Sequence, residues 1–233
     1  AEYIIVNNDS GESSVVERLK SHPAAPTIIH ESSNGGFGRA NNSGAKAASG
    51  EVLFFVNPDA ELNKGNLHSV LAAFRFRPKA LYGMALARET GEREPWSSGS
   101  FPNLFRLIAS HIAPRSVSAP WKTSQIQRVD WVSGAALAVR REFFCQIQGF
   151  DESFFLYFED VDLARRATEV GGWVGVYPFM EFCHKGGQSH AGFREKKEAY
   201  YAGQRRYFRK WRPALESAAL SIGHRIKDLF RSL

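Results

Sequence analysis

Residues 51–62 read EVLFFVNPDAEL, and this stretch indicates a layered α/β fold. Its first six residues form an almost continuous apolar run, the pattern of a strand buried on both faces of a parallel sheet. Asn57, Pro58 and Asp59 follow this strand, and ligands of open α/β sheets bind beyond the carboxyl ends of the strands. A carboxylate there can hold a hard divalent cation that also contacts substrate phosphates. Asn-Pro and Asp favour an ordinary turn equally well, so the segment alone supports both interpretations.

Strand and helix patterns alternate on both sides of this stretch, which predicts an α/β layered domain. Further strands are expected at residues 3–6, 27–30, 80–87 and 173–183, and at 128–140 with Ser133 and Gly134 in the middle. Helices are expected at 15–20, 40–49, 67–76, 103–112, 141–147 and 159–170. From residue 195 onward two helices flank Pro213.

Composition excludes several classes of protein. The 233 residues, 43% hydrophobic and 23% charged, suit one large domain or two small ones and exclude disorder or a disulfide scaffold. The only cysteines, Cys145 and Cys183, fit a reducing compartment. No apolar run approaches the ~20 residues of a membrane span. These features predict a cytoplasmic protein.

The positive charge is concentrated at one end of the chain. Residues 193–233 hold 11 Lys and Arg against 4 Asp and Glu, whereas the first 192 residues hold 19 against 20. The tail also carries aromatic residues near helical spacing, a combination that suits an anionic membrane interface. The same pattern equally fits an amphipathic helix that packs on the body.

The segment FEDVDL contains Glu159, Asp160 and Asp162 at the start of a predicted helix. One of these carboxylates can serve as a general base. Acidic residues in a first helical turn also complement the helix dipole, and Asp162 can form a surface pair with Arg165 or Arg166. The segment by itself favours this second interpretation, although the aromatic run before it indicates a partly dry pocket.

The segment FCHKGGQS places His184 and Lys185 where a strand enters a Gly-Gly loop. His184 can bind a metal and Lys185 a phosphate, although a lone histidine is more often structural. A zinc site is excluded because the spacing of cysteines and histidines is wrong. Residues 34–39, NGGFGR, lack the third glycine and the context of a dinucleotide loop, and no P-loop lysine is present.

These segments, taken in order, resemble glycosyltransferase family 2 and its bacterial rhamnosyltransferase-like members. IIVNNDS resembles the family's strand that ends in an Asp-Asn-x-Ser loop, and NGGFGRANNSGAKAASG its glycine-rich loop and helix. EVLFFVNPDAEL resembles the strand with a degenerate DXD motif. VDWVSGAALAVRREFF, GFDESFFLYFEDVDLARRATEVGGW and HKGGQS resemble the acceptor side.

The resemblance implies a GT-A fold with a mostly parallel central sheet flanked by helices, a nucleotide-sugar donor, and Mg²⁺ or Mn²⁺. Asp59 matches the metal ligand, with Asn57 in place of the first DXD carboxylate, and His184 matches a histidine that completes the metal or diphosphate site. Asp160 matches the catalytic base, with Glu159 beside it. A base and a metal on opposite sides of the donor imply single displacement with inversion.

The resemblance also assigns substrate contacts. Asn7 lies where the family usually has an Asp that contacts the nucleotide base. The remaining expected contacts with the donor or acceptor are Asn34, Gly36, Arg39, Asn42, Asn57, Gly134, Ala135 and Lys185. The subgroup favours dTDP-L-rhamnose as donor and a polysaccharide or polyprenyl-linked acceptor, while UDP- and GDP-sugars stay open. The sequence does not indicate an oligomeric state.

The resemblance divides the chain into a catalytic domain at 1–192 and basic amphipathic helices at 193–233. The donor half is 1–87 and the acceptor half 88–192. The chain begins at the family's second strand, so its first βα unit, with the central strand of the sheet, is expected to be missing. The tail predicts a peripheral place on the inner face of the cytoplasmic membrane.

Three alternatives stand beside this interpretation. A nucleotidyltransferase would need a glycine-rich loop near the first strand to bind a triphosphate, and the sequence contains no such loop. A nucleic-acid-binding module would extend a basic face over the body, which is near neutral. A family member too degenerate for catalysis also fits Asn7, Asn57 and the missing unit.

Overall fold

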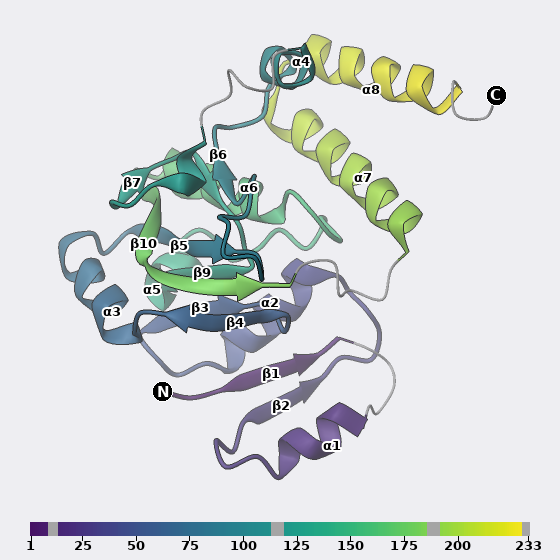
Figure 1. Ribbon diagram of the computed structural model, residues 1–233. Helices are drawn as coiled ribbons and strands as arrows, with labels where there is room; N and C mark the ends of the chain where they lie inside the picture. Colours follow the sequence, from purple (N-terminus) through teal and green to yellow (C-terminus); the bar gives the residue numbers. More distant parts are fainter. Residues whose placement is uncertain (9–13, 113–118, 186–191, 230–233) are drawn as a thin grey trace.

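The computed structural model describes residues 1–8, 14–112, 119–185 and 192–229, and it has the predicted α/β architecture (Figure 1). The central six-stranded sheet has the order β3-β9-β5-β10-β4, and β7 also pairs with β10. Their bounds are β3 Val52–Val56, β4 Ala60–Lys64, β5 Ala80–Ala87, β7 Gln127–Arg128, β9 Ala136–Arg140 and β10 Trp173–His184. Strands β3, β5 and β10 run in one direction, and β9 and β4 run in the other. The sheet expected to be mostly parallel is therefore mixed.

Helices cover both faces of this sheet. On one face Leu81 lies in an apolar cluster with residues of α5, Arg141–Gln146, and α6, Glu159–Glu169. On the other face Tyr82 packs with Phe74 of α3, Leu67–Phe76. Every residue of β5 is buried, as expected for a strand between two layers.

Strand β3 differs from its prediction. Only Leu53 and Phe55 are buried, and Val56 is 42% exposed. The reason is position: β3 ends the strand order and pairs only with β9 among the described residues, so its apolar run is only half covered.

The N-terminal segment forms a separate unit. β1, Ile4–Asn7, pairs in parallel with β2, Thr27–His30, and α1 spans Ser14–Lys20 between them. Helix α2, Phe37–Ala47, packs on β1 through Gly44, whose Cα faces the side chains of Ile4 and Val6. Within the described residues no hydrogen-bonded ladder joins β1 to β3.

The region expected to be one strand at 128–140 contains three short ones. β7 ends at Arg128, β8 is Trp131–Val132, and β9 begins at Ala136. β8 pairs with β6, Ser98–Gly99, outside the central sheet. The interruption leaves Ser133 and Gly134 in a turn between β8 and β9.

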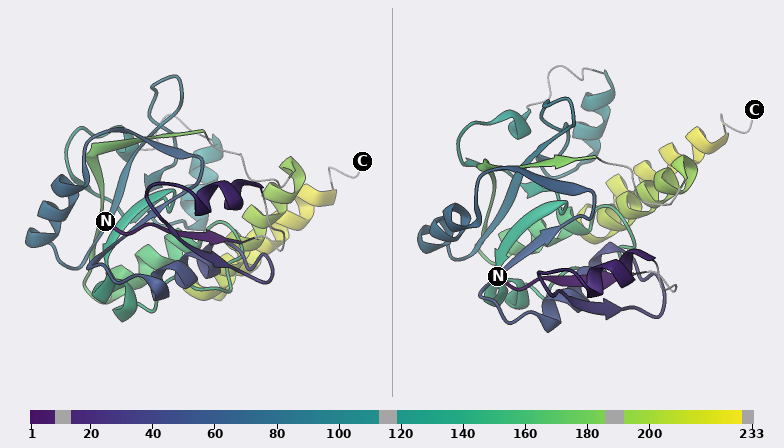
Figure 2. Two further views of the ribbon diagram at one scale, coloured as in Figure 1. Left: turned by 90° about the horizontal axis from the view of Figure 1, so that it is seen from below. Right: turned by 60° about the horizontal axis from the view of Figure 1, so that its bottom comes forward.

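The tail forms α7, Phe193–Trp211, and α8, Ala214–Leu229, which lie at the opposite end of the molecule from α3 (Figure 2). Tyr207 and Phe208 are buried in an apolar cluster with Phe154, Phe158 and Leu220. Burying each such side chain stabilises the folded protein by about 1.5–3 kcal/mol, so these two residues hold α7 against the body of the domain. α4, Leu104–Ile112, begins beside α8, because the Leu104 N–H donates to the Glu216 carboxylate at 3.0 Å. Among the described helices, none combines the length and apolar character that crossing a membrane requires.

Candidate active site

Asp59 and His184 come together at the ends of two strands. Asp59 follows β3 in a turn closed by the Ala60 N–H, which donates to the Asn57 carbonyl at 3.0 Å, and His184 is the last residue of β10. The His184 Nε2 and Asp59 Oδ1 atoms lie 3.3 Å apart, and both side chains are 13% exposed. The Lys185 N–H donates to the Asp59 carbonyl at 3.0 Å, which fixes the two loops against each other.

Glu94 holds the other nitrogen of the His184 ring. Its Oε2 lies 2.8 Å from Nδ1, and this hydrogen bond raises the pKa of His184, assisted by Asp59 and opposed by burial. A carboxylate on Nδ1 orients the ring and leaves Nε2 toward Asp59, the arrangement found behind many metal-bound histidines. Sequence reasoning missed Glu94 because it lies in a polar loop ninety residues from its partner.

The pair offers one carboxylate and one imidazole to a cation. Among the described residues no group of three or more potential metal-ligating side chains converges. This fits Mg²⁺ or Mn²⁺, which keep several waters and take substrate phosphates as ligands. A closed structural zinc site would need four protein ligands.

Asp160 lies in the first turn of α6, half-buried. Its Oδ2 accepts the Gly134 N–H at 3.1 Å and its Oδ1 accepts the Val161 N–H at 2.8 Å. Burial raises the pKa of Asp160, and these hydrogen bonds oppose the rise. The site thus holds a carboxylate that is more basic than usual and is accessible to a substrate.

The neighbouring Glu159 side chain is buried more deeply than that of Asp160. It is 5% exposed, and its Oε2 has no hydrogen-bond partner among the described residues. Burial, together with the charge of Asp160, raises the pKa of Glu159 well above its ordinary value. Asp160, the less buried of the two, is therefore the carboxylate that a substrate can reach.

The segment that leads into these carboxylates is strained. Tyr157 and Phe158 have φ values of 69° and 71°, a left-handed conformation that costs about 1–3 kcal/mol for each side chain of this kind. The Phe155 carbonyl accepts the Phe37 N–H at 2.9 Å. At Gly36, with φ 88°, a Cβ would stand 2.3 Å from that same carbonyl oxygen, so only glycine fits.

Backbone contacts connect the two parts of the site. The Asn57 N–H, beside Asp59, donates to the Ala135 carbonyl at 2.9 Å, and the neighbouring Gly134 N–H donates to Asp160. Asn57, Gly134 and Ala135 therefore lie between the pair Asp59–His184 and Asp160. This arc brings a carboxylate and a candidate cation site around one region.

The predicted N-terminal contacts form a second loop cluster. Asn7 ends β1, and the next residue, Asn8, organises the glycine loop. The Asn8 amide donates to Asn34 Oδ1 at 3.1 Å and to the Gly36 carbonyl at 3.2 Å. Nothing in the sequence pattern distinguished Asn8 from Asn7.

Three predicted substrate contacts are engaged elsewhere. The Arg39 guanidinium lies 3.9 Å from the Glu31 carboxylate, and Lys185 is paired with Glu61 at 2.8 Å. Asn42 is buried and forms two hydrogen bonds with the Phe150 backbone, both at 2.9 Å. Asn42 thus holds the Phe150 backbone in place. Contact with a substrate stays a prediction for Arg39, Lys185 and Asn42. Residues 186–189 of the HKGGQS motif lie outside the described residues.

Comparisons with known proteins point to one family. The family model described as Glycosyl transferase family 2 matches residues 1–134, more than half of the chain. The N-acetylglucosaminyl-diphospho-decaprenol L-rhamnosyltransferase of Mycobacterium tuberculosis is 34% identical over 146 residues, 57% of this chain and 46% of the relative. The chain thus spans less than half the length of that relative. Rhamnosyltransferase WbbL of Escherichia coli is 26% identical over 206 residues, 83% of this chain and 77% of that protein.

Solved structures share the fold. The structure of GalNAc-T7 with UDP, GalNAc and Mn²⁺ aligns with a TM-score of 0.63 at 16% identity, over 91% of this chain and 42% of that one. Staphylococcus aureus TarS 1–349 in complex with UDP-GlcNAc aligns with a TM-score of 0.57 at 18% identity, over 94% of this chain and 60% of that one. The fold is GT-A, and with the match over residues 1–134 the chain belongs to glycosyl transferase family 2.

Proposed function

We propose that this chain catalyses the inverting transfer of a sugar, L-rhamnose from dTDP-L-rhamnose, to a polyprenyl-linked or polysaccharide acceptor. The observation that carries the proposal is the arc from Asp59 and His184 through Asn57 and Ala135 to Asp160. In this proposal Asp160 is the base, and Asp59 and His184 form the site for the leaving diphosphate. The names of the two rhamnosyltransferase relatives support the choice of sugar.

In this mechanism Asp160 accepts the proton of the acceptor hydroxyl as that oxygen attacks the anomeric carbon. The N–H groups of Gly134 and Val161 hold the carboxylate in place, and its raised pKa suits proton abstraction. Glu159 lies buried beside it, and burial together with the charge of Asp160 raises the pKa of Glu159. The bond between the sugar and the diphosphate breaks on the opposite face of the sugar, so the configuration inverts.

Asp59 and His184 would hold Mg²⁺ or Mn²⁺ together with the donor diphosphate. A bound cation supplies neutralisation of the negative charge on the departing nucleoside diphosphate. Glu94 orients His184 toward this task through Nδ1. Arg39, which the resemblance assigns to the donor, and Lys185, which its segment offers to a phosphate, are paired here with Glu31 and Glu61.

A screen of nucleotide sugars tests the proposal. Thermal shift and donor hydrolysis are measured for dTDP-rhamnose, UDP-sugars and GDP-sugars, with Mn²⁺ and with EDTA. We expect stabilisation by dTDP-rhamnose only with metal, lost in Asp59→Ala and kept in the control Glu61→Gln. Metal-independent binding would contradict the cation site at Asp59 and His184. Stabilisation without turnover of any sugar with any acceptor would instead favour a non-catalytic binding protein.

The proposal includes a peripheral site on the inner face of the cytoplasmic membrane. Two adjoining helices support it: α4 exposes Phe105 by 79%, and α8 exposes Leu215 by 83%. Arg106 and Arg225 are exposed on the same two helices. Co-sedimentation with phosphatidylglycerol vesicles should fall in Phe105→Ser/Leu215→Ser and not in Phe76→Ser, a control on α3 that is 84% exposed. Equal binding by all three proteins would remove the membrane site.

A further inference from the structure

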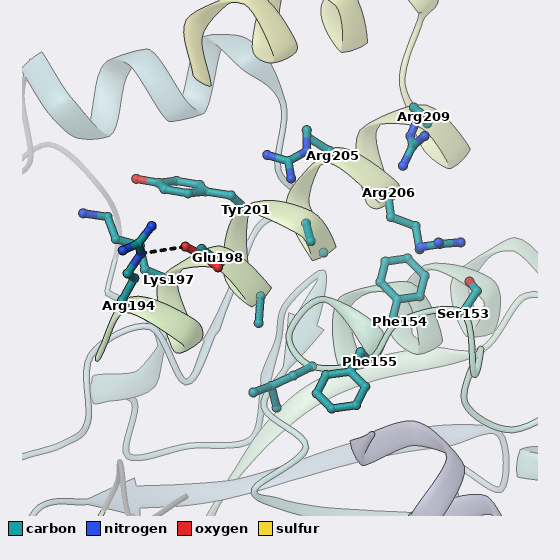
Figure 3. Close-up of a pocket in the computed structure, with 14 residues that line it drawn as sticks. Ser153, Phe154, Phe155, Arg194, Lys197, Glu198, Tyr201, Arg205, Arg206 and Arg209 are labelled. Carbon is teal, nitrogen blue, oxygen red and sulfur yellow. Dashed lines mark hydrogen bonds and ion pairs between the residues drawn. The ribbon is translucent and has the colours of Figure 1, made fainter. Parts of the chain in front are cut away.

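A groove of about 1230 Å³ lies between α7 and the loop at residues 153–156. Figure 3 shows Arg205, Arg206 and Arg209 on its helical side, with Phe154 and Phe155 on the loop below. This groove takes no part in the arc that joins Asp59 to Asp160. Its loop nevertheless leads directly into Glu159 and Asp160.

The charge of the groove is strongly positive. Five of its lining residues are Lys or Arg, and one, Glu198, is acidic. Glu198 is paired with Arg194 at 3.0 Å. Arg206 and Arg209 make no ion pair within the described part of the chain, and Arg206 lies over the Phe154 ring at 6.0 Å. Two guanidinium groups are thus directed to a groove whose described lining holds no carboxylate for them.

Other cations of the same helix are neutralised. Lys210 contacts Asp151 at 2.6 Å and Asp162 at 2.8 Å, and Arg212 contacts Glu216 at 2.6 Å. These contacts anchor α7, whereas Arg206 and Arg209 face the groove. Both arginines are exposed, so an anionic ligand can reach their guanidinium groups.

The groove has a fixed position relative to Asp160. At Gly203 of α7 a Cβ would stand 2.4 Å from the Tyr157 carbonyl, so the helix backbone rests on the loop two residues before Glu159. Phe155 is 53% exposed beside the groove and offers an apolar surface next to the arginines. A ligand with an anionic group and an apolar chain would match both features.

We propose that this groove binds the diphosphate of a polyprenyl-diphosphate-linked acceptor, with Arg206 and Arg209 as the phosphate contacts. The inference rests on the proposed function and adds the place where the acceptor is held. Guanidinium groups pair with phosphate oxygens through charge-assisted, often bidentate hydrogen bonds. With the diphosphate in the groove, the sugar it carries extends toward Asp160 along the loop.

Calorimetry with farnesyl diphosphate tests the inference, with EDTA present so that no metal can bridge the probe to Asp59. The proteins are the unchanged chain, Arg206→Gln/Arg209→Gln, and the charge-matched control Arg75→Gln/Arg128→Gln, two exposed arginines outside both the groove and the proposed membrane site. We expect the groove variant to bind at least about 10-fold more weakly, because a hydrogen bond to a charged group is worth about 1.5–3 kcal/mol. The control should bind like the unchanged chain, and thermal melting checks that both variants fold.

Three outcomes would overturn the inference. Equal weakening of farnesyl diphosphate binding in both double variants would mean that the effect comes from the overall positive charge of the protein and not from the groove. Inorganic pyrophosphate binding as tightly as farnesyl diphosphate would indicate a free-phosphate site, and loss of the probe in Asp59→Ala would place it in the donor site. Because the assay contains no donor, a negative result here leaves the donor screen standing, and a failed donor screen leaves the calorimetric result unchanged.

Discussion

The two sides of the first turn of α6 use the same residue type for opposite purposes. On the side toward the site, Asp160 is half-buried and accepts hydrogen bonds from two backbone N–H groups. On the side toward α7, Asp162 is fully buried and contacts Arg166 at 2.8 Å, Lys210 at 2.8 Å and the Trp211 indole at 2.7 Å.

The difference shows how environment divides the roles of two carboxylates two residues apart. Among the described residues no cationic side chain forms an ion pair with Asp160, so its carboxylate is left for a substrate in the proposed mechanism. Asp162 is surrounded by cations that belong to the fold, so its charge is used to hold α7. The same Asp→Asn change should therefore remove activity at one position and stability at the other.

Asp160→Asn should have the largest effect. Loss of a general base costs about 10²–10⁴-fold in rate, while the amide can still accept the Gly134 N–H and needs no buried charge. Sugar transfer is measured with the donor that the screen identifies, and unfolding is followed in urea. Full activity in this variant would refute Asp160 as the base.

Asp162→Asn should lower the free energy of unfolding by about 3–5 kcal/mol, because it leaves Lys210 and Arg166 without their buried partner. Asp160→Asn is the matched control and should differ from the unchanged chain by less than ~1 kcal/mol. Urea denaturation of the three proteins checks the comparison. Equal stability of the two variants would contradict the separation of roles.

Glu94→Gln extends the comparison to the candidate cation site, where the Glu94 carboxylate contacts His184 and not the cation itself. Removing the charge behind His184 should weaken Mn²⁺ binding about 10–100-fold. Titration of Mn²⁺ in the presence of the donor nucleotide measures it, with Glu92→Gln, exposed in the same loop, as control. Unchanged affinity would show that Glu94 serves only the fold.

Local periodicity predicted most of the fold. Leu67–Phe76 and Ala80–Ala87 have the predicted bounds, because each has a clear apolar pattern and short flanking turns. β4, Ala60–Lys64, escaped notice since AELNK is mostly polar and forms an edge strand through its pairing with β10. The single strand expected at 128–140 breaks where Gly134 turns toward Asp160.

The site was harder to predict because its contacts are tertiary. Asp59, His184 and Asp160 carry motif signals, but Glu94 meets His184 only through the fold. The charge spacing allowed a surface pair of Asp162 with Arg165 or Arg166. Arg166 does contact Asp162, but the carboxylate is buried and not at the surface. The same spacing gave no sign that Lys210 and Trp211 would cover it, since they lie almost fifty residues away.

The smallest effect concerns Asp151, which shares Lys210 with Asp162 but lies nearer to solvent. Partial burial opposes its ionisation, yet the hydrogen bonds from Lys210 and Ser153 outweigh this and lower the pKa of Asp151 to about 2. The pKa of an unfolded Asp is about 3.9, so the stability from this contact is present above that pH and is lost as the pH falls toward 2. Allowing for solvent screening, Asp151→Asn should cost about 1 kcal/mol at pH 7.

Urea denaturation at pH 7, 4 and 2.5 measures how the difference between Asp151→Asn and the unchanged chain depends on pH. The difference should shrink between pH 4 and pH 2.5, because the unfolded Asp151 is protonated below its pKa of about 3.9 and the advantage of the ionised carboxylate in the folded chain falls toward zero near pH 2. A difference that stays constant with pH would mean that Asp151 holds α7 by packing rather than by charge. Lys210 would then depend on the buried Asp162 alone, and the contrast between the two sides of α6 would become sharper.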